Sequence, residues 1–188
     1  MTIEYDGTNY YGWQKQPDKR TIQDVLEQSI YKITGEKVKL IGSGRTDAKV
    51  HALNQKANFK TNSNIPTDKF PYAINSLLPM DISVKDAIEV DLNFSARYDA
   101  KQKTYKYLIY NRKVRSALLK NYAYHYPYEL DVEVMQIACE YFIGEYDLSA
   151  FCSSSTESKT RIRHIYNMFL CYENDCIAIY MTANGFLY

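Results

Sequence analysis

Apolar positions in the first part of the chain predict a strand followed by an amphipathic helix and a second strand. Residues 2–5 have the length and composition of a short strand. Beyond them, apolar side chains recur every three to four residues from Thr21 to Thr34, which predicts a helix capped by Thr21 and ended by Gly35. A further strand is expected at residues 37–41, leading into a polar loop.

The pattern then changes to a period of two. Four residues that we expect to face inward alternate with four polar ones: Leu53, Gln55, Ala57 and Phe59 against Asn54, Lys56, Asn58 and Lys60. A short helix is predicted near residues 68–78 and a strand near 82–90. The resulting order of strand, helix, strand, strand, helix, strand is typical of a ferredoxin-like unit with an antiparallel sheet.

The second half of the chain repeats this theme less completely. Residues 104–111 are strand-like, and residues 131–143 carry a helical stripe that Gly144 is expected to end. A hairpin is predicted from strands at 163–172 and 176–182, with its turn at 173–175. Residues 183–188 resemble the start of another apolar element, so we expect this half to be truncated at its C-terminus.

Composition favours a water-soluble, cytoplasmic protein. The 188 residues are 46% hydrophobic, which is enough for a buried core. No window approaches the roughly 20 apolar residues of a membrane span, and no basic segment followed by an apolar stretch opens the chain. The four cysteines and three histidines are scattered, so neither a disulfide framework nor a metal site is expected.

Charge is nearly balanced over the whole chain but not along it. The formal net charge is +1, yet between Arg97 and Lys120 eight basic residues face Asp99 as the only acid. Such a local excess can neutralise the phosphates of a nucleic acid, and it can equally be a solvated protein face. Charge alone leaves both interpretations open.

Asp47 is the strongest candidate for a chemical role. It lies in the polar stretch Gly42–Ala52, between two apolar runs, and Gly42 and Gly44 suggest a backbone that turns tightly or adopts positive φ. Arg45, two residues before it, can favour the ionised carboxylate. The alternative is that Asp47 only shapes the turn, since Asp hydrogen-bonds locally in such loops.

The same stretch carries a family resemblance. Gly-x-Gly-Arg-Thr-Asp-x-x-Val-His-Ala is similar to the signature of the tRNA pseudouridine synthase A family. Other segments agree in the right order: Tyr5–Gln14, Phe94–Arg97 followed by Lys103–Tyr107, Arg163–Ile165 and Ala183–Tyr188. The resemblance implies an α+β fold of two ferredoxin-like halves, at 1–96 and 97–188, with an antiparallel sheet and helices on one face.

The resemblance also implies an activity. It is the isomerisation of uridine to pseudouridine in the anticodon stem and loop of tRNA, at about positions 38–40 of the RNA, without cofactor or metal. It implies a homodimer as well. A non-catalytic RNA-binding module that retains the fold is the alternative function.

Roles of single residues follow from the same resemblance. Asp47 is the expected catalytic carboxylate, the Tyr105 ring is expected against the target uracil, and Arg45 is expected to help hold the flipped nucleotide. Candidates for phosphate contact are Lys15, Lys101, Lys103, Lys106 and Arg163. His51 and Gln55 are interpreted as loop packing, and Lys49 stands where most members of the family have glycine.

Overall fold

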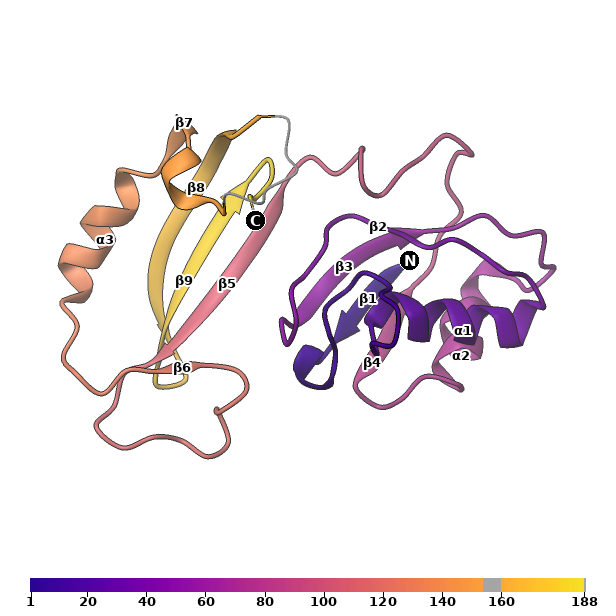
Figure 1. Ribbon diagram of the computed structural model, residues 1–188, viewed down its shortest axis with the longest axis horizontal. Helices are drawn as coiled ribbons and strands as arrows, with labels where there is room; N and C mark the ends of the chain where they lie inside the picture. The colour runs from indigo at the N-terminus through magenta and orange to yellow at the C-terminus, as the bar shows by residue number, and fades with distance from the viewer. Residues whose placement is uncertain (154–159, 188) are drawn as a thin grey trace. The chain divides into compact units, whose positions relative to one another are not determined.

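The computed structural model describes residues 1–153 and 160–187 as two compact units, residues 1–100 and 101–188 (Figure 1). Tyr188, the last residue of the closing segment, lies outside the described residues. Each unit is built on its own sheet, and the described part contains three α-helices, so the chain has the predicted α+β class.

The first unit has the predicted element order. Its elements are β1 (Thr2–Tyr5), α1 (Ile22–Thr34), β2 (Ile41–Gly42), β3 (Ala52–Asn58), α2 (Phe70–Asn75) and β4 (Ile82–Asp86), with 3₁₀ turns at Gly7–Asn9 and Thr67–Lys69. The strands pair in the order β2-β3-β1-β4, and every neighbouring pair is antiparallel. This is the arrangement expected for a ferredoxin-like unit.

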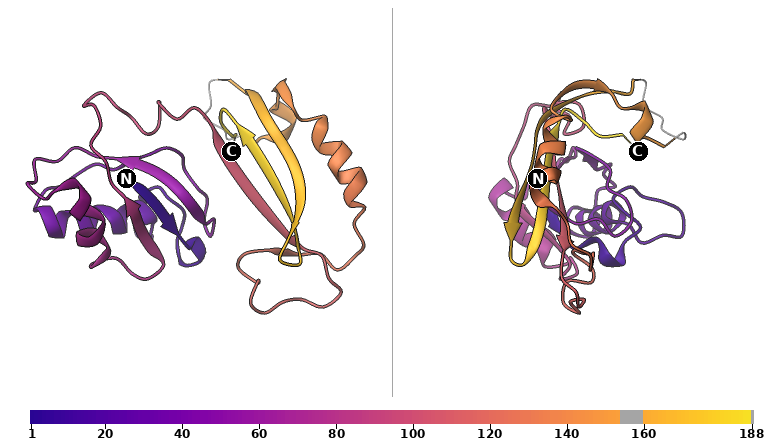
Figure 2. Two further views of the ribbon diagram at one scale, coloured as in Figure 1. Left: turned by 180° about the vertical axis from the view of Figure 1, so that it is seen from behind. Right: turned by 90° about the vertical axis from the view of Figure 1, so that its left-hand side faces the viewer.

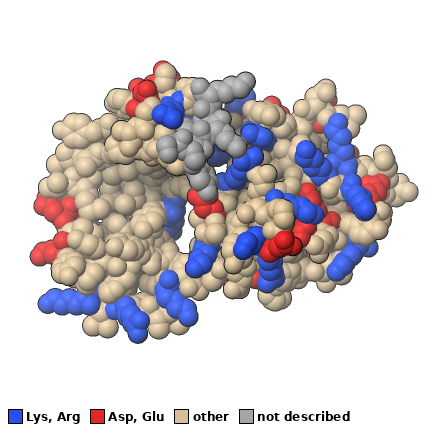
Figure 3. Space-filling view, in the orientation of Figure 1, with Lys and Arg blue, Asp and Glu red and all other residues tan. Residues whose placement is uncertain are grey.

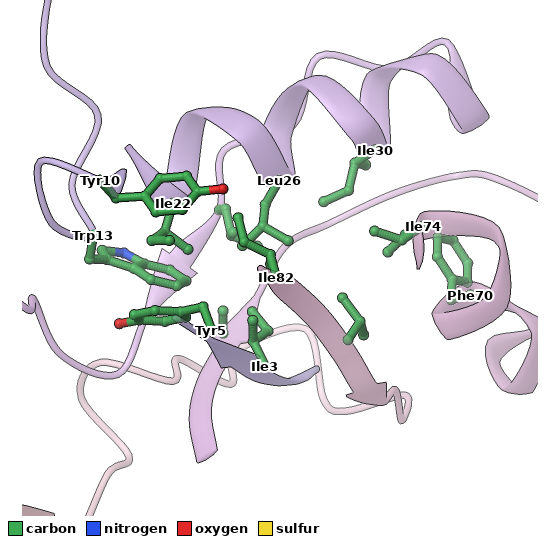
Figure 4. Packing of buried hydrophobic residues seen from close by; sticks show 13 residues of the cluster. Ile3, Tyr5, Tyr10, Trp13, Ile22, Leu26, Ile30, Phe70, Ile74 and Ile82 are labelled. Atoms are coloured by element: carbon green, nitrogen blue, oxygen red, sulfur yellow. The ribbon is translucent and has the colours of Figure 1, made fainter. Parts of the chain in front are cut away.

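The core of the first unit lies between the sheet and its helices, as Figure 4 shows. Three residues of the α1 stripe, Ile22, Leu26 and Ile30, are fully buried. They pack with apolar residues of the sheet, of which Figure 4 labels Ile3, Tyr5 and Ile82 of β1 and β4. Thr21 caps α1 by accepting the Asp24 N–H at 3.4 Å, and Gly35 ends it with φ +73°. The local signals and the buried stripe therefore specify the same helix.

Some boundaries in the first unit differ from the prediction. The strand expected at 37–41 is reduced to Ile41–Gly42, and the strand expected to reach residue 90 ends at Asp86. Leu53 is 75% exposed although the alternation placed it inside, whereas Gln55 and Ala57 are buried as predicted. A short strand ends where its pairing with the neighbouring strand ends. The hydrophobic pattern of one strand alone does not predict that end point.

The segment after β4 is secured to the same unit. Asn58 on β3 accepts the Ala96 N–H at 2.8 Å and donates to the Phe94 carbonyl at 3.2 Å. Ala96 is only 3% exposed. The first unit therefore includes the Phe94–Arg97 segment.

The second unit is a five-stranded sheet with one helix. Its elements are β5 (Lys103–Tyr110), β6 (Tyr124–His125), α3 (Val132–Glu140), β7 (Gly144–Asp147), β8 (Ile162–Glu173) and β9 (Cys176–Ala183), with a 3₁₀ turn at Ser149–Phe151. The order is β6-β5-β9-β8-β7, antiparallel except for the β5–β6 pair. Strands β5, β9 and β8 run side by side in both Figure 1 and Figure 2.

The predicted hairpin of this unit is confirmed. Asn174 and Asp175 join β8 to β9 with φ values of +44° and +68°, the left-handed pair that a tight two-residue turn requires. The predicted helix is shorter than expected: α3 ends at Glu140, and Gly144, at φ +131°, begins β7 instead of ending the helix. The helix ends before Gly144 in two 3₁₀-type turns, in which the Phe142 N–H donates to the Cys139 carbonyl and the Ile143 N–H donates to the Glu140 carbonyl.

Helix α3 packs along β8. The Gln136 side chain accepts the Leu170 N–H at 2.8 Å, on a stretch of β8 beyond the residues that pair with β7. A polar side chain of α3 thus satisfies a main-chain N–H at the edge of β8. Over residues 1–153 and 160–187, the helices are all too short or too polar to cross a membrane.

Candidate active site

Asp47 lies on a loop whose backbone is tied down while its carboxylate faces solvent. Four hydrogen bonds hold the loop: Ser43 N–H to the Lys56 carbonyl (2.8 Å), Gln55 Nε2 to the Gly44 carbonyl (2.6 Å), Trp13 N–H to the Thr46 carbonyl (3.0 Å) and Lys49 N–H to the Tyr10 carbonyl (3.1 Å). Asp47 itself is exposed, and so is Arg45. The loop therefore presents a fixed carboxylate outward.

The support comes from the segment that includes Tyr10 to Trp13. Gly12 adopts φ +84°, and a Cβ there would lie 2.4 Å from the Thr46 carbonyl oxygen. At Gly42 a Cβ would lie 2.6 Å from the Trp13 ring. Gly42 is thus required by close packing rather than by positive φ, and two segments distant in sequence form one structure around Asp47.

Side chains on the inner side of the loop complete the attachment. The Tyr5 hydroxyl and the Thr46 hydroxyl lie 2.8 Å apart, and the buried Gln55 accepts the Ser43 hydroxyl at 3.1 Å. His51 Nδ1 lies 3.1 Å from the Gly7 N–H and 3.0 Å from an Asp6 carboxylate oxygen. Without a proton, Nδ1 accepts from the Gly7 N–H; with a proton, it donates to the Asp6 carboxylate. The tautomer of His51 therefore decides which of the two bonds forms. These contacts agree with loop packing for His51 and Gln55.

The carboxylate of Asp47 is available to a substrate. In the part of the chain that the structure describes, no hydrogen bond or ion pair involves it. The expected ion pair between Asp47 and Arg45 is therefore a proposal for the protein with RNA bound. The turn itself is closed by the Val50 N–H, which donates to the Asp47 main-chain carbonyl at 3.2 Å, so shaping the turn does not occupy the Asp47 side chain.

Lys49 adopts the left-handed conformation that glycine occupies most easily, with φ +68°. An L-residue there loses about 1–2 kcal/mol relative to its preferred region, whereas glycine loses about 0.5–1 kcal/mol of chain entropy on folding. We expect Lys49→Gly to stabilise the protein by about 0.5–1 kcal/mol and to raise Tm by about 1–4 °C. Thermal unfolding followed by circular dichroism measures this shift.

Lys49→Ala is the matched control, because it removes the charge but keeps the strained backbone. Its Tm should stay near that of the parent protein. A glycine variant no more stable than the alanine variant would show that this residue stores no backbone strain.

Tyr105 lies in the second unit, on β5. Its ring packs edge-to-face on Phe186, with centroids 4.7 Å apart and planes at 80°, and the side chain is 37% exposed. On the sheet Tyr105 pairs with Met181 of β9, so those two side chains share a face. The period-two pattern of β5 did not decide which of its faces is exposed to solvent. The structure shows that the face carrying Tyr105 is partly exposed.

A cavity of about 310 Å³ is lined by Phe186, whose ring contacts Tyr105, but not by Tyr105 itself. It is largely apolar, and Met181, Phe186 and Arg163 are among the residues that line it. Its volume is at the small end of the range for ligand sites in proteins. The partly exposed Tyr105 ring is a surface on which a planar base can stack.

The predicted phosphate-binding cations differ in their surroundings. Lys15 contacts Asp24 at 2.5 Å and Glu27 at 3.7 Å, and the bond to Asp24 raises its pKa. Lys106 is paired with Glu173 and lies over the Tyr180 ring; the Glu173 carboxylate raises the Lys106 pKa. A phosphate would have to compete with carboxylates at both positions.

The remaining three lie in the second unit. Arg163 donates to its neighbouring Thr160 and Ile162 carbonyls at 2.9 and 2.6 Å, Lys101 is exposed, and Lys103 is half-buried. Lys15 belongs to the first unit, and the other four cations belong to the second.

A wider groove of about 730 Å³ lies between α2 and β4 in the first unit. Asp68, Asp86 and Glu89 line it, and none of the predicted site residues does. Three carboxylates disfavour a polyanion, so we do not assign RNA to this groove.

One feature of the site was not predicted. The buried Tyr10 donates to Asp81 at 2.5 Å and accepts from Arg20 at 3.1 Å, and burial raises its pKa well above the usual value. This network anchors the segment that supports the Asp47 loop. The packing role of Gln55 was expected, and its bonds to the Ser43 hydroxyl and the Gly44 carbonyl supply the partners that a buried glutamine requires.

Comparison with known proteins supports the resemblance. A family model described as tRNA pseudouridine synthase matches residues 1–99 and 138–188. Proteins named tRNA pseudouridine synthase A are similar over all 188 residues: those of Caldicellulosiruptor bescii at 71% identity, Caldicellulosiruptor saccharolyticus at 70% and Acetivibrio thermocellus at 53%. The chain spans 77% of the length of each of these relatives. Tyr105 lies outside the two matched segments but inside the similarity to the relatives.

Proposed function

Because this chain belongs to the tRNA pseudouridine synthase family, and is therefore an isomerase that forms pseudouridine in tRNA, we propose that Asp47 is its catalytic carboxylate. The observation that carries the proposal is the contrast between backbone and side chain. Hydrogen bonds tie down the loop on both sides of Asp47, while its carboxylate faces solvent without a partner in the described part of the chain.

The chemistry requires such a group. In pseudouridine formation the bond from C1′ to N1 of uracil breaks, the base rotates, and a bond from C1′ to C5 forms. The proton on C5 is lost, and N1 gains one. Breaking the glycosidic bond builds positive charge on the ribose, as in glycoside cleavage, and a carboxylate beside the sugar can stabilise that charge, attack C1′ or remove a proton from the adjacent carbon.

Arg45 and Tyr105 are proposed to hold the reacting nucleotide. A stacked or paired uridine hides its glycosidic bond, and flipping it out costs a few kcal/mol. A ring such as Tyr105 can return about 1–3 kcal/mol by stacking. Arg45, exposed two residues from Asp47, is proposed to contact a phosphate and keep the carboxylate ionised.

The cations contribute unequally to this proposal. Lys101, exposed and two residues before β5, is the position where we place a phosphate first, and Lys103, the half-buried first residue of β5, comes after it. Arg163 lines the cavity near Tyr105 and is proposed to reach the nucleotide from that side. Lys15 and Lys106 are assigned weaker roles, because each is engaged by glutamate or aspartate.

We further propose that the substrate uridines lie in the anticodon stem and loop, at about positions 38–40, and that the enzyme acts in the cytoplasm as a homodimer. An exposed apolar face on α3 supports a protein contact: Val134, Ile137 and Tyr141 are 59%, 54% and 77% exposed at helical spacing. Sedimentation equilibrium tests the assembly, and a monomeric mass at micromolar concentration would contradict it.

Tritium release tests the reaction and its location. tRNA labelled with tritium at uracil C5 should lose label to water, because the C5 proton departs when C1′ bonds to C5. Transcripts with cytidine at the three proposed positions should release none. Release from those transcripts would overturn the location, and no release from any tRNA would overturn the activity of this chain.

A further inference from the structure

The loop of residues 111–128, which contains the β5–β6 connection, β6 and the three residues after it, combines positive charge with exposed aromatic rings. Between Asn111 and Tyr128 the chain has no Asp or Glu, and it carries these basic residues and tyrosines: Arg112, Lys113, Arg115, Lys120, Tyr122, Tyr124, Tyr126 and Tyr128. All four basic residues are exposed. Lys and Arg side chains line the lower edge of the second unit in Figure 3, where Figure 1 shows this loop.

The base of the loop is fixed to the sheet. Asn111 donates to the Tyr126 and Tyr128 carbonyls at 2.7 and 2.6 Å, and His125 Nε2 lies 2.8 Å from the Arg112 carbonyl. Because β6 pairs with β5, the two ends of the loop are also joined by main-chain bonds. The charges are therefore held at one end of the sheet.

Three of the four cations lack an ion-pair partner among the residues that the structure describes. Arg112 contacts Asp175 at 2.8 Å. For Lys113, Arg115 and Lys120, no ion pair occurs among residues 1–153 and 160–187. Tyr124 and Tyr128, at 56% and 71% exposure, are open to solvent beside them. Grouped like charges repel one another, and a polyanion relieves that repulsion.

We propose that the loop of residues 111–128, which follows the end of β5 farther from Tyr105, binds the sugar–phosphate backbone of the tRNA. The inference rests on the proposed function for the identity of the RNA. Charge complementarity selects RNA over a second copy of the chain, because the loop offers cations without carboxylates. The loop belongs to residues 100–137, which the family model does not match, and it contains none of the residues assigned to the reaction.

Salt-dependent tRNA binding tests the proposal. We expect the triple variant Lys113→Gln, Arg115→Gln, Lys120→Gln to lower the slope of log affinity against log salt by about 2–3, since each phosphate contact contributes about 0.7–0.9. Between 50 and 200 mM salt the parent protein should then lose about 20- to 40-fold more affinity than the variant. Fluorescence anisotropy with unmodified tRNA measures both curves.

The matched control is Lys32→Gln, Lys37→Gln, Lys39→Gln, which removes the same charge from exposed positions of the first unit. It should keep the parent slope. Equal reductions of the slope in both triple variants would show that net charge alone causes the effect, and would contradict the proposal. An unchanged slope in the loop variant would also overturn it. Sedimentation showing lost self-association with an unchanged slope would instead assign the loop to a contact between copies.

The readout is independent of turnover. If the parent protein released no tritium but its binding slope still depended on the loop cations, the reaction proposal would fail while the loop proposal stood. If tritium release depended on Asp47 but the slope did not depend on the loop, the opposite would hold.

Discussion

Replacing Asp47 with asparagine is expected to reduce tritium release from C5-labelled tRNA by at least about 10²- to 10⁴-fold, the range over which a positioned acid or base contributes to rate. Asparagine has nearly the same shape but no negative charge. It can neither stabilise the positive charge on the ribose nor attack C1′ nor accept a proton from the sugar. The loss should appear in kcat under conditions where tRNA is saturating.

The structure gives this substitution a clean interpretation. Asp47 is exposed, and its carboxylate makes no bond within the described part of the chain, so the variant should fold and bind tRNA like the parent. Circular dichroism and tRNA anisotropy check both points. Asp68→Asn, a similar change at another exposed aspartate, is the matched control and should retain full release. Release that survives Asp47→Asn would remove the carboxylate from the reaction.

The sequence predicted the loop that carries Asp47 but not how the loop is held. Polar residues and glycines between two apolar runs identified it, because these are local signals. Its supports come from distant segments: the Tyr10 and Trp13 main chain, the Tyr5 hydroxyl and the Gln55 amide. Such contacts depend on strand order, which a local pattern does not contain.

Helix caps and tight turns were predictable because they too depend on local signals. Thr21, Gly35 and the Asn174-Asp175 turn act through neighbouring backbone groups and appear where the sequence places them. The strands β6 and β7 were not predicted, because two to four residues carry too little periodicity and pairing with β5 and β8 defines them. The end of α3 was missed because Gly144 is a strand residue here.

Pattern also could not assign Tyr105 to the site. β5 carries aromatic or apolar residues on both faces, so alternation alone is ambiguous. The structure adds the partial exposure of the ring, its contact with Phe186 and the cavity that Phe186 lines. Asp47 and Tyr105 belong to different units, and their joint action on one nucleotide remains a prediction that mutation can test.

Tyr105→Ala is expected to lower kcat/KM for tRNA by about 5- to 150-fold, the equivalent of losing about 1–3 kcal/mol of stacking on the flipped uracil. Tyr105→Phe keeps the ring and should retain most of the activity. The same tritium assay, run at tRNA concentrations below KM, measures both variants. The pair separates stacking from the loss of the hydroxyl group, because only alanine removes the aromatic face.

Damage to the sheet is the competing explanation for a weak alanine variant, since Tyr105 also packs on Phe186. Tyr172→Ala is the control for it. Tyr172 is 74% exposed and lies on β8, which β9 separates from β5. It pairs with Ile177, four residues along β9 from the Met181 that pairs with Tyr105. Four residues of strand separate the two sites by about 13 Å. If stacking is the role of Tyr105, Tyr172→Ala leaves kcat/KM near the parent value while both alanine variants keep similar Tm. Equal activity of the parent, Tyr105→Phe and Tyr105→Ala proteins would exclude the ring as the surface on which the uracil stacks.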